Sequence, residues 1–263
     1  MPSEIIAEFS SNWGGKREVL SRMLDEAVVA KVDWVKTQSH SIQHLNPDDP
    51  QWAWMMQAEM LDTDHTWFQR HCAMRGMKWL TTPFHPSRVP FLADLGLEAI
   101  KVGSGEASDP VMLEVIAKYP WKVYLSTGLM TAQDFLRTLT ILHDREVVLM
   151  HTVSEYPTPT RKVNLGRMEW LADQFGLPVG YSDHTTGLHA ALAAIARGAA
   201  AVEVHFAAQG DVPRRNVWDK DRDDLSTLVL FRDAMEQMLA PGRMLWHNGE
   251  ERPYVNRWRY AAH

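Results

Sequence analysis

The sequence contains a single cysteine, Cys72, among 263 residues, and this scarcity excludes an internal disulfide framework. One free thiol fits a reducing compartment, so we expect a cytoplasmic protein. Cys72 lies in a helical run, WFQRHCAMRGM, where a free cysteine usually packs as a small buried hydrophobe and not as a nucleophile. The segment MPSEIIAEFSSN at the N-terminus is typical of a strand with acidic flanks, and we expect no signal peptide.

Long apolar runs and a basic stripe are missing as well. No stretch approaches the roughly 18 to 20 apolar residues that a membrane span needs, so we expect no membrane partner. The net charge is −6, with 27 basic and 33 acidic residues interspersed, and we expect no nucleic-acid partner, which would need clustered Lys and Arg. The net charge does not exclude an anionic small molecule as the ligand, because a few lysines in one pocket dominate the local electrostatic potential.

Short Val- and Ile-rich strands alternate with amphipathic helices along the whole sequence. Eight strands are predicted, at residues 5–10, 33–38, 78–84, 99–105, 122–127, 147–153, 178–183 and 200–206. Helices are predicted at 17–30, 109–119, 132–143, 188–198 and 223–239. This alternation predicts a parallel α/β sheet, and eight units predict closure into a single-domain (β/α)8 TIM barrel. We place the barrel at residues 1–240 and a C-terminal tail at 241–263.

The longest connection follows the second strand and runs from His40 to Gly76. It contains NPDDP, a turn and helix-start signal, and then an amphipathic stretch at 51–60. A long loop on this side of a barrel is either a lid or substrate wall, or a second helix with an irregular start.

Two histidines, His184 and His205, each follow a predicted strand and are about one β/α unit apart. If these strands are neighbours, the imidazoles emerge side by side at the C-terminal rim, where such barrels carry chemistry. Two neutral imidazoles there predict half of a divalent-metal site, although either histidine alone would more often be structural. Asp183 would either orient the His184 ring or cap the next helix.

Lysine, hydroxyl and glycine residues cluster after the fourth and fifth strands, as KVGSGE at 101–106 and STG at 126–128. Strand alternation would turn Lys101 inward, and the glycines would let the backbone approach a ligand closely. This combination suits a phosphate, whereas the alternative is a solvated lysine before a tight turn. Ser154 and Tyr156, on alternate positions after the sixth strand, would face one cavity or lie in a loop that caps the next helix.

Taken together, these blocks resemble the sialic acid synthase family, the phosphoenolpyruvate-condensing enzymes that make N-acetylneuraminate and related nonulosonic acids. The matching segments are IIAEFSSNWGG, WVKTQS, TTPF, IKVGSGE, LSTGLMT, HTVSEYPTP, VGYSDHTTG and VEVHF, in family order. The resemblance implies a transferase of carbohydrate biosynthesis that binds phosphoenolpyruvate, an aldose and a divalent metal, Mn²⁺ or Mg²⁺. It implies that C3 of the enol attacks the aldehyde of an N-acylated hexosamine, and it leaves a homodimer open.

Carried over position by position, His184 and His205 match the two metal-binding histidines of the family. The positions that would hold phosphoenolpyruvate or the sugar are Lys101, Ser104, Ser126, Ser154, Tyr156, Thr82, Lys36, Gln38 and Asn216. Glu106 is the candidate for proton handling at the reacting carbons, because a carboxyl walled by apolar residues has a raised pKa. Glu106, Lys36 and the two histidines form the implied catalytic set.

The sequence also departs from the family pattern on the acceptor side. NHNG or NHEG in the family reads NWGG at 12–15 here, and Asn216 stands where a sugar-binding aspartate would fall. The sequence ends before the family's antifreeze-like C-terminal domain would begin, so we expect the barrel domain only. Two other functions stay open: a metal-dependent aldolase or lyase acting on another acid, and a catalytically silent sugar-acid-binding relative.

Overall fold

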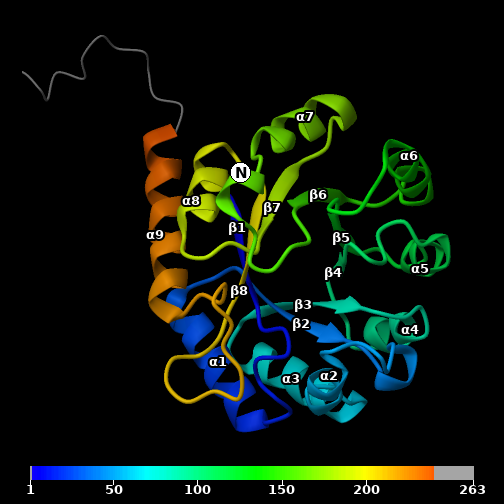
Figure 1. Ribbon diagram of the computed structural model, residues 1–263, viewed down its shortest axis with the longest axis vertical. Coiled ribbons are helices and arrows are strands. Elements are labelled where there is room, and N and C mark those ends of the chain that lie inside the picture. Colours follow the sequence, from blue (N-terminus) through cyan, green and yellow to red (C-terminus); the bar gives the residue numbers. More distant parts are fainter. Residues whose placement is uncertain (1, 240–263) are drawn as a thin grey trace, which may run out of the picture.

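The computed structural model describes residues 2–239, which fold as one α/β domain. The strands are β1 (Glu4–Glu8), β2 (Trp34–Ser39), β3 (Lys78–Pro83), β4 (Ala99–Val102), β5 (Lys122–Ser126), β6 (Val147–Thr152), β7 (Val179–Asp183) and β8 (Ala201–His205). They form one parallel sheet in the order β3-β2-β1-β8-β7-β6-β5-β4, and the end strands β3 and β4 contact each other, which closes the ring (Figure 1). The predicted TIM barrel and its eight strands are confirmed, whereas the predicted tail lies outside the described residues.

Helices surround this sheet in the described part of the chain. They are α1 (Arg17–Ala30), α2 (Trp52–Gln57), α3 (Asp62–Met74), α4 (Arg88–Asp94), α5 (Pro110–Ile116), α6 (Ala132–Ile141), α7 (Gly166–Phe175), α8 (His189–Ala196) and α9 (Arg222–Leu239), with 3-10 turns η1 (Ile42–His44) and η2 (Thr160–Lys162). Helix α6 begins at a capping box of Thr131 and Asp134, and α5 begins with Pro110 after the N-cap Asp109. No described helix has both the length and the apolar content to cross a membrane.

Apolar side chains fill the barrel toward the N-terminal ends of the strands. Ile6, Trp34, Tyr124 and Met150 belong to this inner cluster, which is separate from the larger core between sheet and helices. Below it, Glu4 pairs with Lys122 at 2.7 Å and accepts hydrogen bonds from Trp34 and Tyr124. Side chains thus close the N-terminal end of the barrel, and the polar strand-end residues lie at the opposite end.

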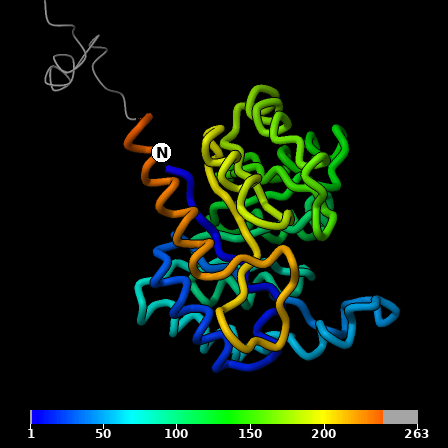
Figure 2. The backbone as a smooth tube through the Cα atoms, turned by 60° about the vertical axis from the view of Figure 1, so that its left-hand side comes forward, coloured from blue at the N-terminus to red at the C-terminus, as the bar shows by residue number. Residues whose placement is uncertain are grey.

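The connection between β2 and β3 contains two helices with different places. Helix α3 packs on β3 as the outer helix of its unit and buries Cys72, as predicted for this cysteine. Helix α2 lies against the loop after β1, where Trp54 Nε1 donates to Ser11 Oγ at 2.7 Å. The second-helix interpretation is therefore confirmed for α3, whereas α2 contacts the loops after β1 and β8. Figure 2 shows the segment after β2, in light blue, extending from the body of the barrel.

Candidate active site

A cavity of about 290 Å³ opens at the C-terminal ends of the strands. Its lining contains eleven of the twelve residues predicted from the sequence: Lys36, Gln38, Thr82, Lys101, Ser104, Glu106, Ser126, Ser154, Tyr156, His184 and His205. A larger groove of about 510 Å³ lies at the N-terminal ends of the strands, beside Pro178 and Gly198, but barrel enzymes carry their chemistry at the C-terminal ends. The candidate active site is therefore the smaller cavity.

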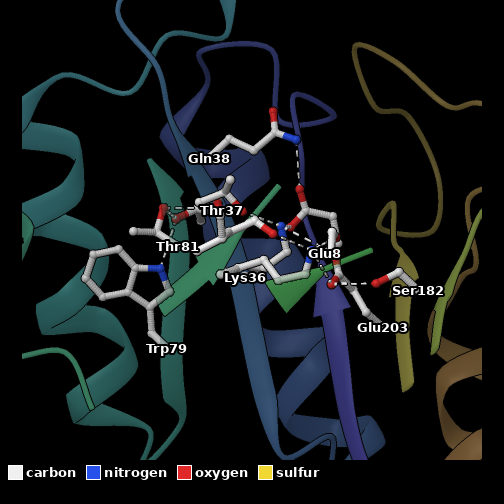
Figure 3. Close-up of polar contacts among 12 residues, drawn as sticks. Glu8, Lys36, Thr37, Gln38, Trp79, Thr81, Ser182 and Glu203 are labelled. Carbon is white, nitrogen blue, oxygen red and sulfur yellow. Dashed lines mark hydrogen bonds and ion pairs between the residues drawn. The ribbon is translucent and has the colours of Figure 1, made fainter. Parts of the chain in front are cut away.

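Lys36 is the centre of a buried charge network on the floor of this cavity (Figure 3). Its Nζ lies 2.7 Å from Oε2 of Glu8 and 3.4 Å from Oε1 of Glu203. The other oxygen of Glu203 lies 3.5 Å from Nζ of Lys101, and the Gln38 amide donates to Glu8 at 3.0 Å. Two ammonium groups and two carboxylates thus lie close together, and each charge has an opposite neighbour.

The surroundings of these four groups set their pKa values in different directions. Burial lowers the pKa of Lys36, but Glu203 and Glu8 outweigh burial and leave it raised. Burial lowers the pKa of Lys101 more than Glu203 raises it. The pKa of Glu203 is lowered because Lys101 and Lys36 outweigh its burial, whereas burial raises the pKa of Glu8. Lys101 would therefore gain most from an anionic ligand, which would stabilise its charged form.

Sequence reasoning missed Glu8 and Glu203, which lie in β1 and β8. Their only signal was a charged residue inside an otherwise apolar strand: Glu8 in IIAEF and Glu203 in AVEVH. Glu203 stands two positions before His205, and alternate residues of a strand share a face. In the strand register Glu8 is level with Lys36 and His205, whereas Glu203 is level with Ile6, two residues before Glu8.

The hydroxyl groups beside Lys101 form a tight cradle around Gly128. The Lys101 ammonium donates to Ser126 Oγ at 2.5 Å. A Cβ atom at Gly128 would lie 2.6 Å from Ser154 Oγ and 2.9 Å from Ser104 Oγ, so only glycine lets these two serines converge. One ammonium and three hydroxyls from three neighbouring β/α units offer the donors that a phosphate accepts.

Glu106 folds back over the turn that follows β4. A Cβ atom at Gly103 would lie 2.6 Å from Glu106 Oε2, so a side chain at this position would push the carboxylate away from the backbone. Burial raises the pKa of Glu106, and the nearby Lys101 offsets only part of that effect. A carboxyl with a raised pKa beside a cavity is suited to donating and accepting a proton.

The two histidines lie together at the cavity wall, with their ring centroids 5.3 Å apart. Nδ1 of His184 lies 2.8 Å from the carbonyl oxygen of Val153, and the ring packs on Tyr156 at a centroid distance of 3.9 Å. If Nδ1 carries the proton in that contact, Nε2 keeps its lone pair. Nδ1 of His205 is buried and has no hydrogen-bond partner among the described residues.

Burial keeps both rings neutral, which is the form that binds a metal. It lowers the pKa of His184, and burial together with His184 holds the pKa of His205 well below its ordinary value. Within residues 2–239, no group of three or more His, Cys, Asp or Glu side chains is placed to hold a metal ion. The pair therefore fits half of a metal site, with water or substrate as the source of further ligands.

Asp183, beside His184, does not cap the next helix. The N-cap of α8 is Leu188, and the Asp183 carboxylate instead accepts from Thr185 N at 2.9 Å and from the Tyr181 hydroxyl at 3.1 Å. Its other oxygen lies 3.3 Å from Nζ of Lys220. The capping interpretation was wrong because the turn after β7 continues for several residues before α8 begins.

Asn216, the twelfth predicted residue, is not among the described residues that line the cavity. Its amide donates to Asp219 at 3.2 Å and to Asn12 at 3.3 Å. In the same loop, Arg214 lies over the Trp54 ring at 5.4 Å, which joins the loop after β8 to α2. The loop after β8 therefore contacts both the loop after β1 and helix α2.

Comparison with known proteins finds a family model, relatives and a solved structure that cover most of the chain. The model of the NeuB family matches residues 23–242. N,N'-diacetyllegionaminic acid synthase of Campylobacter jejuni is 33% identical over 222 residues, which cover 77% of this chain and 66% of that protein. The chain therefore spans slightly less than two thirds of that relative. Pseudaminic acid synthase of the same species is 27% identical, over 91% of this chain and 76% of its own. The crystal structure of N-acetylneuraminic acid synthetase from Leptospira borgpetersenii superposes with a TM-score of 0.87 at 25% identity and covers 98% of this chain and 92% of that one.

Proposed function

The chain belongs to the NeuB family of nonulosonic acid synthases, and on this premise we propose that it condenses phosphoenolpyruvate with an aldose of the N-acylhexosamine kind. C3 of the enol forms a bond to the aldehyde carbon, water adds at C2, and phosphate leaves by cleavage of its C–O bond. The products are a 2-keto-3-deoxy sugar acid and inorganic phosphate. One observation carries the proposal: eleven residues that match the family pattern line a single cavity.

The cradle around Gly128 is the proposed phosphate site. Lys101 and the three serines hold the phosphate oxygens by charge-assisted hydrogen bonds. Binding a phosphate stabilises the charged form of Lys101, whose pKa burial lowers. Fixing the phosphate at the wall of a small cavity orients the enol toward the acceptor, which replaces a diffusional encounter by a positioned one.

Lys36 and Gln38 are proposed to orient the enolpyruvate carboxylate and the acceptor. Glu8 and Glu203 fix the Lys36 ammonium, and Thr82 accepts a hydrogen bond from it at 3.0 Å. A lysine held by three groups keeps one direction, and little reorganisation is needed when substrate binds.

His184 and His205 are the proposed ligands of a divalent cation, as the family implies. When bound, such a cation would act as a Lewis acid on the acceptor's aldehyde oxygen. The charges in the cavity favour a cation, because Glu8, Glu106 and Glu203 face only Lys36 and Lys101 there. A trianionic substrate needs further positive charge in such a cavity.

Glu106 is proposed to handle the proton at the reacting carbons. Burial raises its pKa, so the carboxylate takes up a proton more readily than an exposed glutamate does. The side chain can therefore take a proton from the water that adds at C2 and give one to the oxygen of the former aldehyde. Glu106 stands at the mouth side of Lys101, two positions past the serine that closes the phosphate cradle.

Turnover tests this proposal directly. Purified protein is incubated with phosphoenolpyruvate, Mn²⁺ and a panel of N-acylated and plain aldoses, and phosphate release is followed. We expect release only when phosphoenolpyruvate and a suitable aldose are both present, with a loss of release in His184→Ala. If no aldose supports release and His184→Ala binds as much Mn²⁺ as the unaltered protein, the proposal is wrong.

A further inference from the structure

We propose that Lys220 is a positioning residue that ties the two metal-binding histidines together, an inference that rests on the proposed function of His184 and His205. Lys220 is 1% exposed and lies between the loop after β8 and the start of α9. Its backbone bonds to His205, and its side chain contacts the residues beside His184. Figure 1 shows the gold loop that leaves β8 and returns to α9.

The backbone of Lys220 fixes the end of β8. Its N–H donates to the carbonyl oxygen of His205 at 2.7 Å, and its own carbonyl accepts from Ala207 N at 3.0 Å. These two bonds form a short bridge between Lys220 and Phe206, the residue after His205. The backbone at His205 is therefore bonded on one side to β1 and on the other to Lys220.

The side chain of Lys220 fixes the turn after β7. Its Nζ donates to the carbonyl oxygens of Thr185 at 2.8 Å and Trp218 at 3.0 Å, and it lies 3.3 Å from Oδ2 of Asp183. Two backbone carbonyl oxygens accept hydrogen bonds from this ammonium, and the Asp183 carboxylate forms an ion pair with it. Asp183 and Thr185 are the two sequence neighbours of His184, so the ammonium holds the backbone after that histidine directly and the residue before it through its side chain.

A buried ion pair is a poor means of stabilising a fold. Side chains of Lys220 and Asp183 are 1% and 0% exposed, and both lose their hydration on folding. Apolar residues of similar volume would serve stability as well or better at such a place. What the ion pair adds is direction, because hydrogen bonds fix distances that apolar packing leaves adjustable. Groups that orient metal ligands typically alter metal affinity when they are removed.

Mn²⁺ binding to metal-free protein, followed by the electron paramagnetic resonance signal of free Mn²⁺, tests the inference without any turnover. Lys220→Met removes the ammonium, and the double variant Lys220→Met with Asp183→Asn leaves no unpaired charge behind. Lys220→Arg keeps the charge but cannot reproduce the geometry of the ammonium. The matched control is Lys122→Met, which breaks the pair with Glu4 at the far end of the barrel.

We expect the two Lys220→Met variants to bind Mn²⁺ about 10- to 100-fold more weakly, Lys220→Arg to lose less, and Lys122→Met to bind as the unaltered protein does. Circular dichroism restricts the comparison to folded variants, and Lys220→Arg carries the test if the methionine variants do not fold. Unchanged Mn²⁺ affinity in the folded Lys220 variants, whatever their melting temperatures, overturns the inference. If His184→Ala also binds Mn²⁺ normally, the proposed metal site itself is wrong, and the inference is overturned with it.

Discussion

At the scale of single residues, the cavity owes its chemistry to charged groups that are buried beside one another. The charge of Lys36 is kept by Glu8 and Glu203, whereas Lys101 has a weaker partner at 3.5 Å and is left with a lowered pKa. The two lysines are therefore suited to different tasks: Lys36 is already held in place, and Lys101 awaits an anion.

Glu106→Gln removes the proton-carrying group but keeps the shape of the side chain. If Glu106 handles the proton at the reacting carbons, we expect kcat to fall about 10²- to 10⁴-fold while phosphoenolpyruvate binding stays close to that of the unaltered protein. Steady-state kinetics and calorimetric titration measure the two effects separately. Glu114→Gln, on the exposed face of α5, is the control. A kcat within a few-fold of normal would remove Glu106 from the reaction.

His65 makes the fold sensitive to acid. It is fully buried between Trp79 and Phe91, and both of its ring nitrogens lack partners among the described residues. Burial, with a smaller effect of Arg88, lowers its pKa to about 3. The unfolded chain has an ordinary histidine pKa of about 6.5. Between these two values the unfolded state binds the extra proton, so His65 favours unfolding increasingly as the pH falls below about 6.5.

His65→Phe should remove this contribution and fit the same aromatic surroundings. From pH 7.5 to pH 5.0, the contribution of His65 amounts to roughly 2 kcal/mol of lost unfolding free energy. We therefore expect the unfolding free energy of His65→Phe to fall less over this range, by about that amount. Urea unfolding at the two pH values measures it, and other titrating groups cancel in the comparison. Equal pH dependence in both proteins would contradict the lowered pKa.

At the scale of elements, the turns after β4 and β5 set how closely the serine hydroxyls of the proposed phosphate site approach one another. Gly128→Ala would place a Cβ atom 2.6 Å from Ser154 Oγ and 2.9 Å from Ser104 Oγ. We expect the serines to shift and kcat/KM for phosphoenolpyruvate to fall roughly 10- to 100-fold, with the larger part in KM.

A glycine outside the cavity provides the control for Gly128→Ala. A Cβ atom at Gly166, at the start of α7, would meet only Asn164 Oδ1, at 3.7 Å, which is an ordinary contact distance. Gly166→Ala should therefore keep kinetics close to normal. If both alanine variants behave alike, the close approach at Gly128 has no bearing on the phosphate site.

Strand periodicity predicted much of the site, and it also explains what was missed. The C-terminal ends of parallel strands lie at one rim of a barrel. The sequence therefore predicted that Lys101, Ser126 and His205, near the ends of their strands, lie close together. Glu8 ends β1 and Glu203 lies two positions before the end of β8, but a single charged residue in an apolar strand has no distinctive spacing. Their roles depend on lysines from other strands, 3.5 Å away or less, and the pairing appears only in three dimensions.

The contacts among the loops where the sequence departs from the family pattern could not be predicted for the same reason. They join Ser11, Trp54 and the 213–216 loop, which are far apart in the sequence. A Cβ atom at Gly14 would lie 2.5 Å from Pro213, so the loops after β1 and β8 touch where the family pattern is altered. No periodic pattern in the sequence predicts such a contact.

At the scale of the whole molecule, the barrel separates stability from chemistry along its axis. An apolar cluster and the Glu4–Lys122 pair close the N-terminal end, and the ionisable residues of the cavity gather at the other. Eight repeated β/α units predicted this architecture, because closure of eight parallel strands brings distant strand ends to one rim. The proposed reaction needs that convergence, since its phosphate site, lysines and histidines come from β2, β4, β5, β6, β7 and β8.

The most direct measurement is the mass of the product formed from phosphoenolpyruvate labelled with ¹³C at all three carbons. With Mn²⁺ and an accepted aldose, the proposed condensation predicts a 2-keto-3-deoxy acid that carries the three labelled carbons joined to the whole aldose, together with one phosphate. Labelled pyruvate and unchanged aldose, or labelled phosphoenolpyruvate recovered intact with every aldose tried, would contradict the account.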